Sequence, residues 1–117
     1  MENLLSTVDG IPTLTVRAPA SLGEYQLIDV RGPDEFWGEL GHIPGARLAT
    51  LGPELDKFLL SAPPNEKILF ICRSGVRSAR ATQQAQQAGF TQVFNLAGGM
   101  LQWTSQGFLS KRETKPT

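Results

Sequence analysis

Apolar and polar residues follow one another along the chain in a pattern that predicts strands separated by helices. Residues 13–17 alternate between polar and apolar, which predicts a short edge strand. Residues 26–30 and 92–96 predict two further strands. The clearest strand is 67–72, because it is apolar without alternation, as expected for a central parallel strand that is covered on both faces.

Prolines mark several of the expected helix starts. Pro19 predicts a short helical turn, Pro33 a helix with two acids in its first turn, and Pro53 a helix with one apolar face. Further helices are expected from about 78 to 88 and around Trp103. Strands that alternate with helices indicate an α/β fold with a mostly parallel sheet and helices on both faces.

Length and composition fit one domain. The chain has 117 residues, of which 40% are hydrophobic and 19% charged, so it can bury a core. We expect a domain over residues 12–109 between a loose N-terminal segment, 1–11, and a loose C-terminal tail, 110–117. Lys+Arg and Asp+Glu both number 11, so no nucleic-acid partner is expected. The chain has no long apolar run or signal-like start, so we expect no membrane partner and a cytoplasmic location.

The chain has a single cysteine, Cys72, at the end of the central strand. One cysteine excludes an internal disulfide framework and a multi-cysteine zinc site, and we expect no metal and no cofactor. Loop 72–77 lies where parallel sheets bind ligands, ahead of a helix N-terminus that favours anions. Its amides and arginines favour a nucleophilic thiolate or a persulfide. The alternative, a small buried apolar residue, needs neither the arginines nor Gly75.

Four motifs in the same order resemble those of single-domain rhodaneses. They are Cys-Arg-Ser-Gly-Val-Arg-Ser at 72–78, Leu-Ile-Asp-Val-Arg with Glu-Phe at 27–36, Gly-His-Ile-Pro-Gly-Ala at 41–46, and Leu-Ala-Gly-Gly-Met through Trp at 96–103. The resemblance covers roughly residues 12–108. It implies a rhodanese-like fold, a five-stranded parallel sheet flanked by helices, with Cys72 as the sulfur acceptor held by loop amides.

The resemblance and the residue types together predict a substrate-binding loop after Cys72. Its members are Arg73, Ser74, Gly75, Val76, Arg77 and Ser78. We expect Arg77 to face an anionic donor rather than pair with an acid elsewhere. Arg73 is expected to steer thiosulfate, although a solvated side chain is nearly as well supported. Ser74 and Ser78 can donate to a persulfide, and Ser78 is an equally good helix N-cap.

Outside the loop, four residues are expected to support the site: Asp29, Arg31, Glu35 and His42. Asp29 ends a strand expected to neighbour the cysteine strand. We expect it to anchor a turn or pair with Arg31, with orientation of the cysteine loop as the alternative. Glu35 is expected to pair with Arg31. His42, the only histidine, is expected to make structural hydrogen bonds in a tight turn rather than to act in catalysis.

The expected function is sulfur transfer from thiosulfate or a similar small anionic donor, through a persulfide on Cys72. The acceptor would be cyanide or a thiol, such as glutathione or a thioredoxin-like protein. The rivals are a phosphatase or arsenate reductase on the same fold, and a non-enzymatic rhodanese-like binding module. Phosphatase loops hold five residues between Cys and Arg, whereas four separate Cys72 from Arg77. An arsenate reductase would also need a second thiol.

Overall fold

The computed structural model describes residues 2–112. The elements, in chain order, are β1 (Leu4–Val8), β2 (Ile11–Thr15), the 3₁₀-helix η1 (Pro19–Leu22), β3 (Gln26–Asp29), α1 (Pro33–Phe36), β4 (Arg47–Leu48), α2 (Pro53–Ser61), β5 (Lys67–Ile71), α3 (Val76–Gln87), β6 (Gln92–Leu96) and α4 (Gly99–Ser105). The helices after the three prolines and the four strands predicted from the sequence are all present, with bounds that differ by a few residues. The sequence analysis did not locate β1 and β4.

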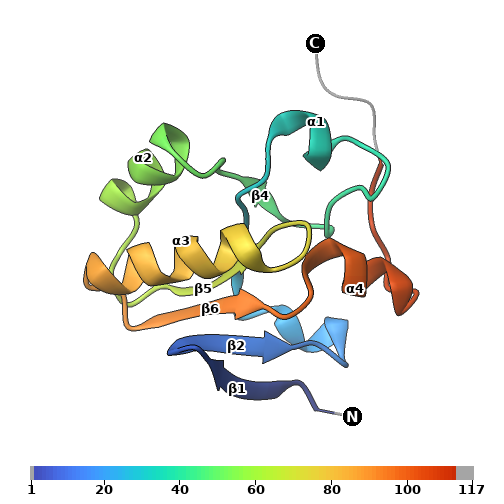
Figure 1. Ribbon diagram of the computed structural model, residues 1–117, viewed down its shortest axis with the longest axis horizontal. Helices are drawn as coiled ribbons and strands as arrows, with labels where there is room; N and C mark the ends of the chain where they lie inside the picture. Colours follow the sequence, from blue (N-terminus) through green and yellow to red (C-terminus); the bar gives the residue numbers. More distant parts are fainter. Residues whose placement is uncertain (1, 113–117) are drawn as a thin grey trace.

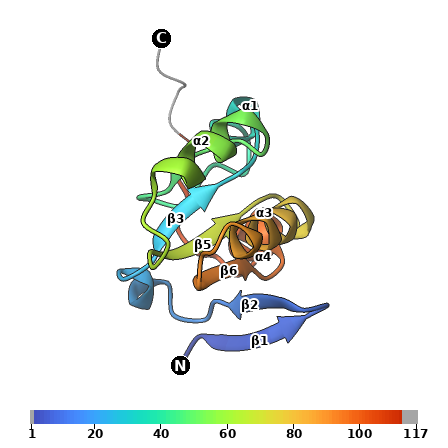
Figure 2. The same ribbon diagram turned by 90° about the vertical axis from the view of Figure 1, so that its left-hand side faces the viewer.

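The strands form one sheet in the order β1-β2-β6-β5-β3-β4. The order can be followed in Figure 2 from β1 to β3. β1 pairs antiparallel with β2, and every other neighbouring pair is parallel. The predicted α/β fold with a mostly parallel sheet is therefore confirmed. The expected number of five strands is wrong, because the described part of the chain forms six.

Compared with the five parallel strands that the resemblance implied, the additional strand is the antiparallel β1. It lies in the N-terminal segment, 1–11, that we expected to be loose. β1 pairs with β2 from Leu4 opposite Thr15 to Val8 opposite Ile11, so β2 is not the edge strand that its alternation predicted. Asp9 and Gly10 make the turn between them, with φ of 51° and 78°. Two residues with positive φ are typical of a tight hairpin turn, and Asp-Gly is a sequence signal for it.

β5 lies at the centre of the sheet, between β6 and β3. Ile68 and Phe70 point into the apolar cluster formed with α2 and α3, while Leu69 and Ile71 point into the cluster formed with η1 and α4. All four side chains are completely buried. The strand lacks alternation because it is buried on both faces, as expected from the sequence. Figure 1 shows α3 lying alongside β5 and β6.

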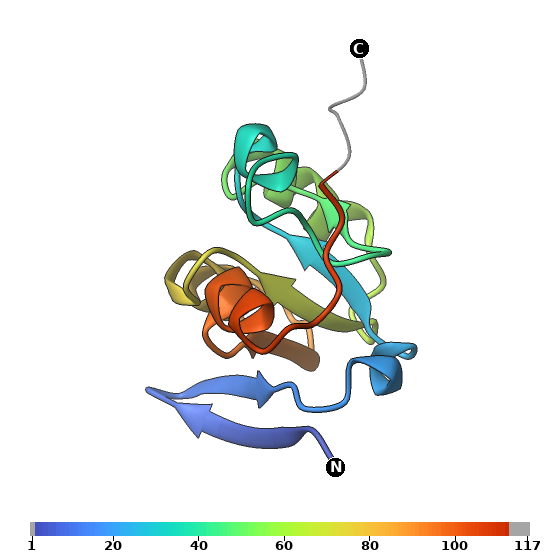
Figure 3. The same ribbon diagram turned by 90° about the vertical axis from the view of Figure 1, so that its right-hand side faces the viewer.

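After α4 the chain runs to the loop that follows α1 (Figure 3). There the backbone of Lys111 pairs with that of His42, with N–H to O distances of 2.9 and 2.8 Å. The start of the predicted loose tail, 110–112, is therefore attached to the domain, while 113–117 lie outside the described residues. Within residues 2–112 no helix has the length and apolar character needed to cross a membrane.

Candidate functional site

Cys72 begins a short loop that links the central strand to α3. β5 ends at Ile71 and α3 starts at Val76, and the turn between them is made at Gly75. Gly75 has a φ of 106°, which residues with a Cβ rarely adopt. We expected the helix to start at about Ser78. It starts two residues earlier, so Ser78 lies within the first turn of the helix and is not its N-cap.

The sulfur of Cys72 lies within hydrogen-bond distance of two donors in a buried position. The Gly75 amide donates to Sγ at 3.0 Å and the Ser78 hydroxyl lies 3.1 Å from it, while Cys72 is only 1% exposed. The positive end of the 12-residue helix α3 lies at the same place. Donors and a helix N-terminus both stabilise negative charge on sulfur, so the loop suits a thiolate or a persulfide.

Asn95 completes this group of contacts, and the sequence analysis missed it. Asn95 lies in β6 and is 8% exposed. Its side-chain oxygen accepts from the Ser78 hydroxyl at 2.5 Å, and its amide nitrogen donates to the Gly75 carbonyl at 3.1 Å. One polar residue between Phe94 and Leu96 in a buried strand is a signal that could have identified it, because buried amides need partners.

Arg77 forms an ion pair with Glu35 in α1. The guanidinium donates to the two carboxylate oxygens at 2.7 and 2.8 Å. This contact holds the pKa of Glu35 below its ordinary value and raises the pKa of Arg77. The expected pairing of Glu35 with Arg31 is wrong, and Arg77 has the acidic partner that we considered the less favoured alternative. Linear spacing could not identify a contact between two separate helices.

Arg31 turns inward instead and pairs with Asp29. Its guanidinium donates to both carboxylate oxygens, with the shortest distance 2.8 Å, and its backbone N–H also donates to Asp29. Both side chains are almost completely buried, at 1% and 0% exposed. Arg31 also donates to the Gly41 carbonyl at 2.7 Å. Asp29 therefore pairs with Arg31, as we expected. Its strand, β3, is the neighbour of β5, which was also expected.

His42 has the contacts of a structural residue. Its Nδ1 lies 2.8 Å from the Phe36 carbonyl, and because a carbonyl only accepts, Nδ1 carries the hydrogen. The imidazole stacks on the Phe36 ring with 3.8 Å between centroids, and it forms a T-shaped contact with the Trp37 ring. These contacts agree with the structural hydrogen bonding predicted for this turn.

The start of α4 holds the first residues of the cysteine loop. The Met100 amide donates to the Cys72 carbonyl at 2.9 Å, and the Leu101 amide donates to the Arg73 carbonyl at 3.0 Å. A Cβ on Gly99 would lie 2.5 Å from both carbonyl oxygens. Glycine is therefore required there for the close approach of the two segments, which gives the Gly-Gly pair of the last motif a physical role.

The other loop residues lie at the surface. Arg73 and Ser74 are exposed, and Val76 is 68% exposed. Next to the loop is a hollow of about 460 Å³, whose opposite wall is the β1–β2 hairpin. The rim of the loop thus offers a positive charge on Arg73, a hydroxyl and an apolar side chain to an approaching molecule.

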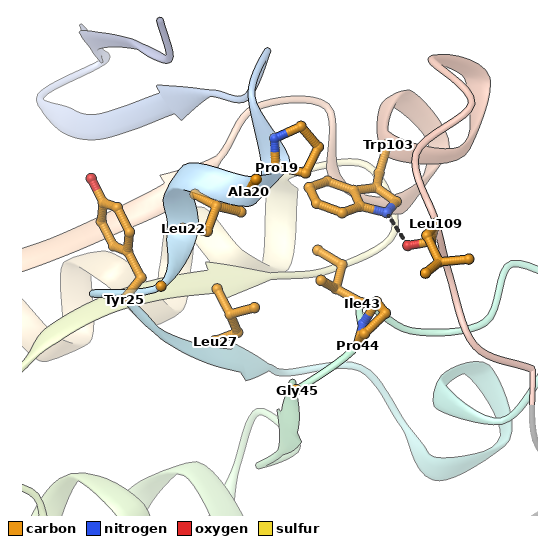
Figure 4. A pocket seen from close by; sticks show the side chains of 11 residues that line it. Pro19, Ala20, Leu22, Tyr25, Leu27, Ile43, Pro44, Gly45, Trp103 and Leu109 are labelled. Carbon is orange, nitrogen blue, oxygen red and sulfur yellow. Dashed lines mark hydrogen bonds between the residues drawn. The ribbon is translucent and has the colours of Figure 1, made fainter.

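A second hollow, of about 470 Å³, lies between η1, the loop before β4 and the end of α4 (Figure 4). Its walls are largely apolar, and the Trp103 indole N–H already donates to the Leu109 carbonyl at 3.0 Å. None of its lining residues belongs to loop 72–78. Cys72 and its loop are therefore separate from this cavity.

Comparisons with known proteins agree with the fold and the loop. The family model for the rhodanese-like domain matches residues 15–106. Thiosulfate sulfurtransferase 18 of Arabidopsis thaliana is 32% identical over 107 residues, with 80% of this chain and 77% of that protein covered. Uncharacterized protein YqhL of Bacillus subtilis is 41% identical over 84 residues, with 72% of this chain and 64% of that protein covered. The chain thus spans less than two thirds of the length of YqhL.

A solved structure supports the same relationship. The human single-domain sulfurtransferase TSTD1 superposes with a TM-score of 0.69 at 30% identity, with 83% of this chain and 98% of that chain covered. The family match includes the central strand, the cysteine loop and α4. The chain therefore belongs to the rhodanese-like domain family.

Proposed function

We propose that this protein is a sulfurtransferase that carries sulfane sulfur as a persulfide on Cys72. The observation that carries the proposal is the presence of two donors, the Gly75 amide and the Ser78 hydroxyl, within hydrogen-bond distance of the cysteine sulfur at the N-terminus of α3. This environment supports an anionic sulfur without a metal or an organic group in the step. Relatives whose names include sulfurtransferase give the proposal independent support.

The reaction has two displacements at sulfur. In the first, the Cys72 thiolate attacks the outer sulfur of thiosulfate, the sulfur–sulfur bond of the donor breaks, and sulfite leaves with the electron pair. In the second, an acceptor thiolate attacks the outer sulfur of the Cys72 persulfide. The acceptor then carries the persulfide and Cys72 is released as thiolate. Each displacement breaks one sulfur–sulfur bond and forms another, so no outside oxidant or reductant is required.

A small anionic donor suits the charge at the loop. Glu35 neutralises Arg77, whereas Arg73 in the loop and Arg80 in α3 are exposed. Exposed positive charge attracts a dianion such as thiosulfate, and dissolved salt screens this attraction so that it acts over a shorter range. The thiol acceptor, glutathione or a thioredoxin-like protein, would approach from the same exposed rim.

Intact-mass measurement tests the proposal directly. After incubation with thiosulfate the protein should gain the mass of one sulfur atom, and dithiothreitol should remove it. Cys72→Ser should show no gain. If Cys72→Ser gains the same mass, or if the folded wild-type protein gains none from thiosulfate or an organic persulfide, the proposal is wrong.

The donor is tested separately by removing charge at the loop. Arg73→Ala should raise the KM for thiosulfate roughly threefold at low salt and have little effect at high salt. Lys57→Ala removes an equal charge from the exposed face of α2 and should leave KM unchanged. Equal effects of the two variants would argue against an anionic donor that is attracted by Arg73.

A further inference from the structure

Hydrogen bonds connect Cys72, Gly75, Ser78 and Asn95 in a closed ring. Gly75 N–H donates to the Cys72 sulfur, and the Gly75 carbonyl accepts from the Asn95 amide nitrogen. The Asn95 side-chain oxygen lies 2.5 Å from the Ser78 hydroxyl oxygen, which lies 3.1 Å from the Cys72 sulfur. The described part of the chain leaves no buried side-chain nitrogen or oxygen without a partner.

The orientation of the Asn95 amide follows from this ring. The Gly75 carbonyl can only accept, so the NH₂ group of Asn95 must face it, and the Asn95 oxygen must then face Ser78. That oxygen also only accepts. The Ser78 hydroxyl therefore has a single hydrogen and two neighbouring acceptors, the Asn95 oxygen and the Cys72 sulfur. It can donate to one of them at a time.

We propose that Asn95 is a positioning residue that competes with the Cys72 thiolate for the Ser78 hydrogen. The proposal deepens the proposed function, since it concerns the same nucleophile. When Cys72 is a thiol, S–H donates to the Ser78 oxygen and the Ser78 hydrogen points to Asn95. When Cys72 is a thiolate, the sulfur only accepts, and the Ser78 hydroxyl rotates toward it. The Asn95 oxygen then loses its donor.

The same competition acts on the persulfide. In the persulfide the negative charge lies on the outer sulfur, and the inner sulfur, Sγ, is a weak acceptor. The Ser78 hydrogen then returns to Asn95. Asn95 thus stabilises the thiol and persulfide states relative to the thiolate, so that it favours the retention of sulfur on Cys72 and moderates the reactivity of the free nucleophile.

The charged side chains on the elements around Cys72 must stay constant in a test. They come from the loop, α3, the end of β3, the turn after β3, and α1: Arg73, Arg77, Asp29, Arg31 and Glu35. None of them donates to or accepts from Asn95 or Ser78 in the contacts described above. Variants at Asn95 and Ser78 therefore change the hydrogen bonds of the ring and leave these charges in place.

A double-mutant cycle measures the competition. The readout is the pH midpoint of Cys72 alkylation by iodoacetamide in the wild type, Ser78→Ala, Asn95→Ala and the double variant. Ser78→Ala should raise the midpoint by about one pH unit, because the thiolate loses a donor. Asn95→Ala also loses the hydrogen bond to the Gly75 carbonyl, and this loss changes the midpoint equally whether or not Ser78 is present. The cycle therefore isolates the term that acts through Ser78.

The cycle compares the shift that Asn95→Ala causes in the wild-type background with the shift that it causes in the Ser78→Ala background. We expect the midpoint shift in the wild-type background to be lower, toward acid pH, by about half a pH unit. Equal shifts in the two backgrounds would mean that Asn95 only anchors the loop, and a coupling of opposite sign would mean that it directs Ser78 toward the thiolate. Either result overturns the proposal. Alkylation needs no sulfur donor, so a failure here is distinct from a failure of sulfur transfer.

Thr82→Val is the matched control. Thr82 is completely buried, lies one turn further along α3, and donates to the Ser78 backbone carbonyl at 2.7 Å. The variant loses a buried hydrogen bond to the same residue without touching its hydroxyl, and its midpoint should equal that of the wild type. A shift like that of Asn95→Ala would overturn the proposal, because helix distortion would then explain both.

A spectroscopic measurement covers the case in which Asn95→Ala does not fold. The chain has one cysteine, so its infrared spectrum has one S–H stretching band. At a pH where Cys72 is a thiol, the wild-type band should lie at lower frequency than the band of Ser78→Ala, because S–H donates to Ser78. Coincidence of the two bands would show that Ser78 does not accept from the thiol, and the proposal would fail.

Discussion

Arg77 and Glu35 are joined by two hydrogen-bonded contacts of 2.7 and 2.8 Å that connect the first turn of α3 to α1. Both side chains are about one third exposed, so water screens the pair and its contribution to stability is small. The contact links α1 to the helix that carries Ser78. It also removes the positive charge of Arg77 from the field that an incoming anion meets.

This ion pair predicts a pH-dependent difference between the wild type and Glu35→Gln. Arg77 lowers the pKa of Glu35 in the folded protein, so the stabilisation is complete above the ordinary pKa of a glutamate and is lost as pH falls through the folded-state pKa. At neutral pH the wild type should be more stable by about 0.2–1 kcal/mol in urea unfolding. The two curves should converge in acid. A difference that persists below the folded-state pKa would contradict the electrostatic origin.

The buried pair of Asp29 and Arg31 should behave differently. Asp29→Asn leaves the Arg31 charge without a counter-ion at a position that is 1% exposed, and such a loss costs about 3–5 kcal/mol of unfolding free energy. Glu24→Gln breaks the exposed pair with Lys67 and is the control. It should change the urea midpoint far less. Similar midpoints for the two variants would mean that the buried carboxylate is not needed to hold Arg31.

A third prediction concerns the close approach of α4 to the cysteine loop. Gly99→Ala places a Cβ 2.5 Å from the Cys72 and Arg73 carbonyl oxygens at a φ of 56°, so the loop must move. Gly107→Ala has a similar positive φ of 79° but open space around the new carbon. The control should lose about 1–2 kcal/mol from backbone strain alone. Gly99→Ala should lose more and also slow persulfide formation. Equal losses would show that the contact is not restrictive.

The extent to which the sequence predicted this site depends on the distance between the interacting residues. The apolar run of β5 and the cysteine that follows it are local features, and so is Gly75 in the loop. They predicted the strand, the loop and the following helix correctly, because burial on both faces of a sheet leaves a continuous apolar pattern. The Asp29–Arg31 pair, two residues apart, was also within reach of local reasoning.

Contacts between separate elements were not predictable in the same way. Glu35 has one arginine near in sequence, Arg31, and another far away, Arg77. Only the folded structure, in which the Arg77 side chain reaches Glu35, selects Arg77. Asn95 is far from Cys72 in sequence and becomes its neighbour through the parallel pairing of β6 with β5. The Asp-Gly turn of the β1–β2 hairpin, in contrast, was a local signal that the sequence analysis did not use.

The final prediction tests whether loop length determines the class of reaction. Four residues separate Cys72 from Arg77, and within this loop Gly75 both donates to Sγ and accepts from Asn95. A glycine inserted between Gly75 and Val76 would create the five-residue spacing of a phosphatase loop. Because α3 is held in the core by Ala81 and Ala85, the added residue must be accommodated by the loop.

The displacement of the Gly75 amide from the sulfur should reduce thiosulfate turnover about 100-fold, since a misplacement of roughly 1 Å at a reacting centre has that effect. The wider loop should gain measurable affinity for phosphate, read by protection of Cys72 from alkylation. A glycine inserted between Gly23 and Glu24, in an exposed turn, controls for the general effect of an insertion and should keep its turnover. Undiminished sulfur transfer in the folded loop variant would refute the prediction, because a loop that works at either length cannot be what separates sulfur transfer from phosphate chemistry.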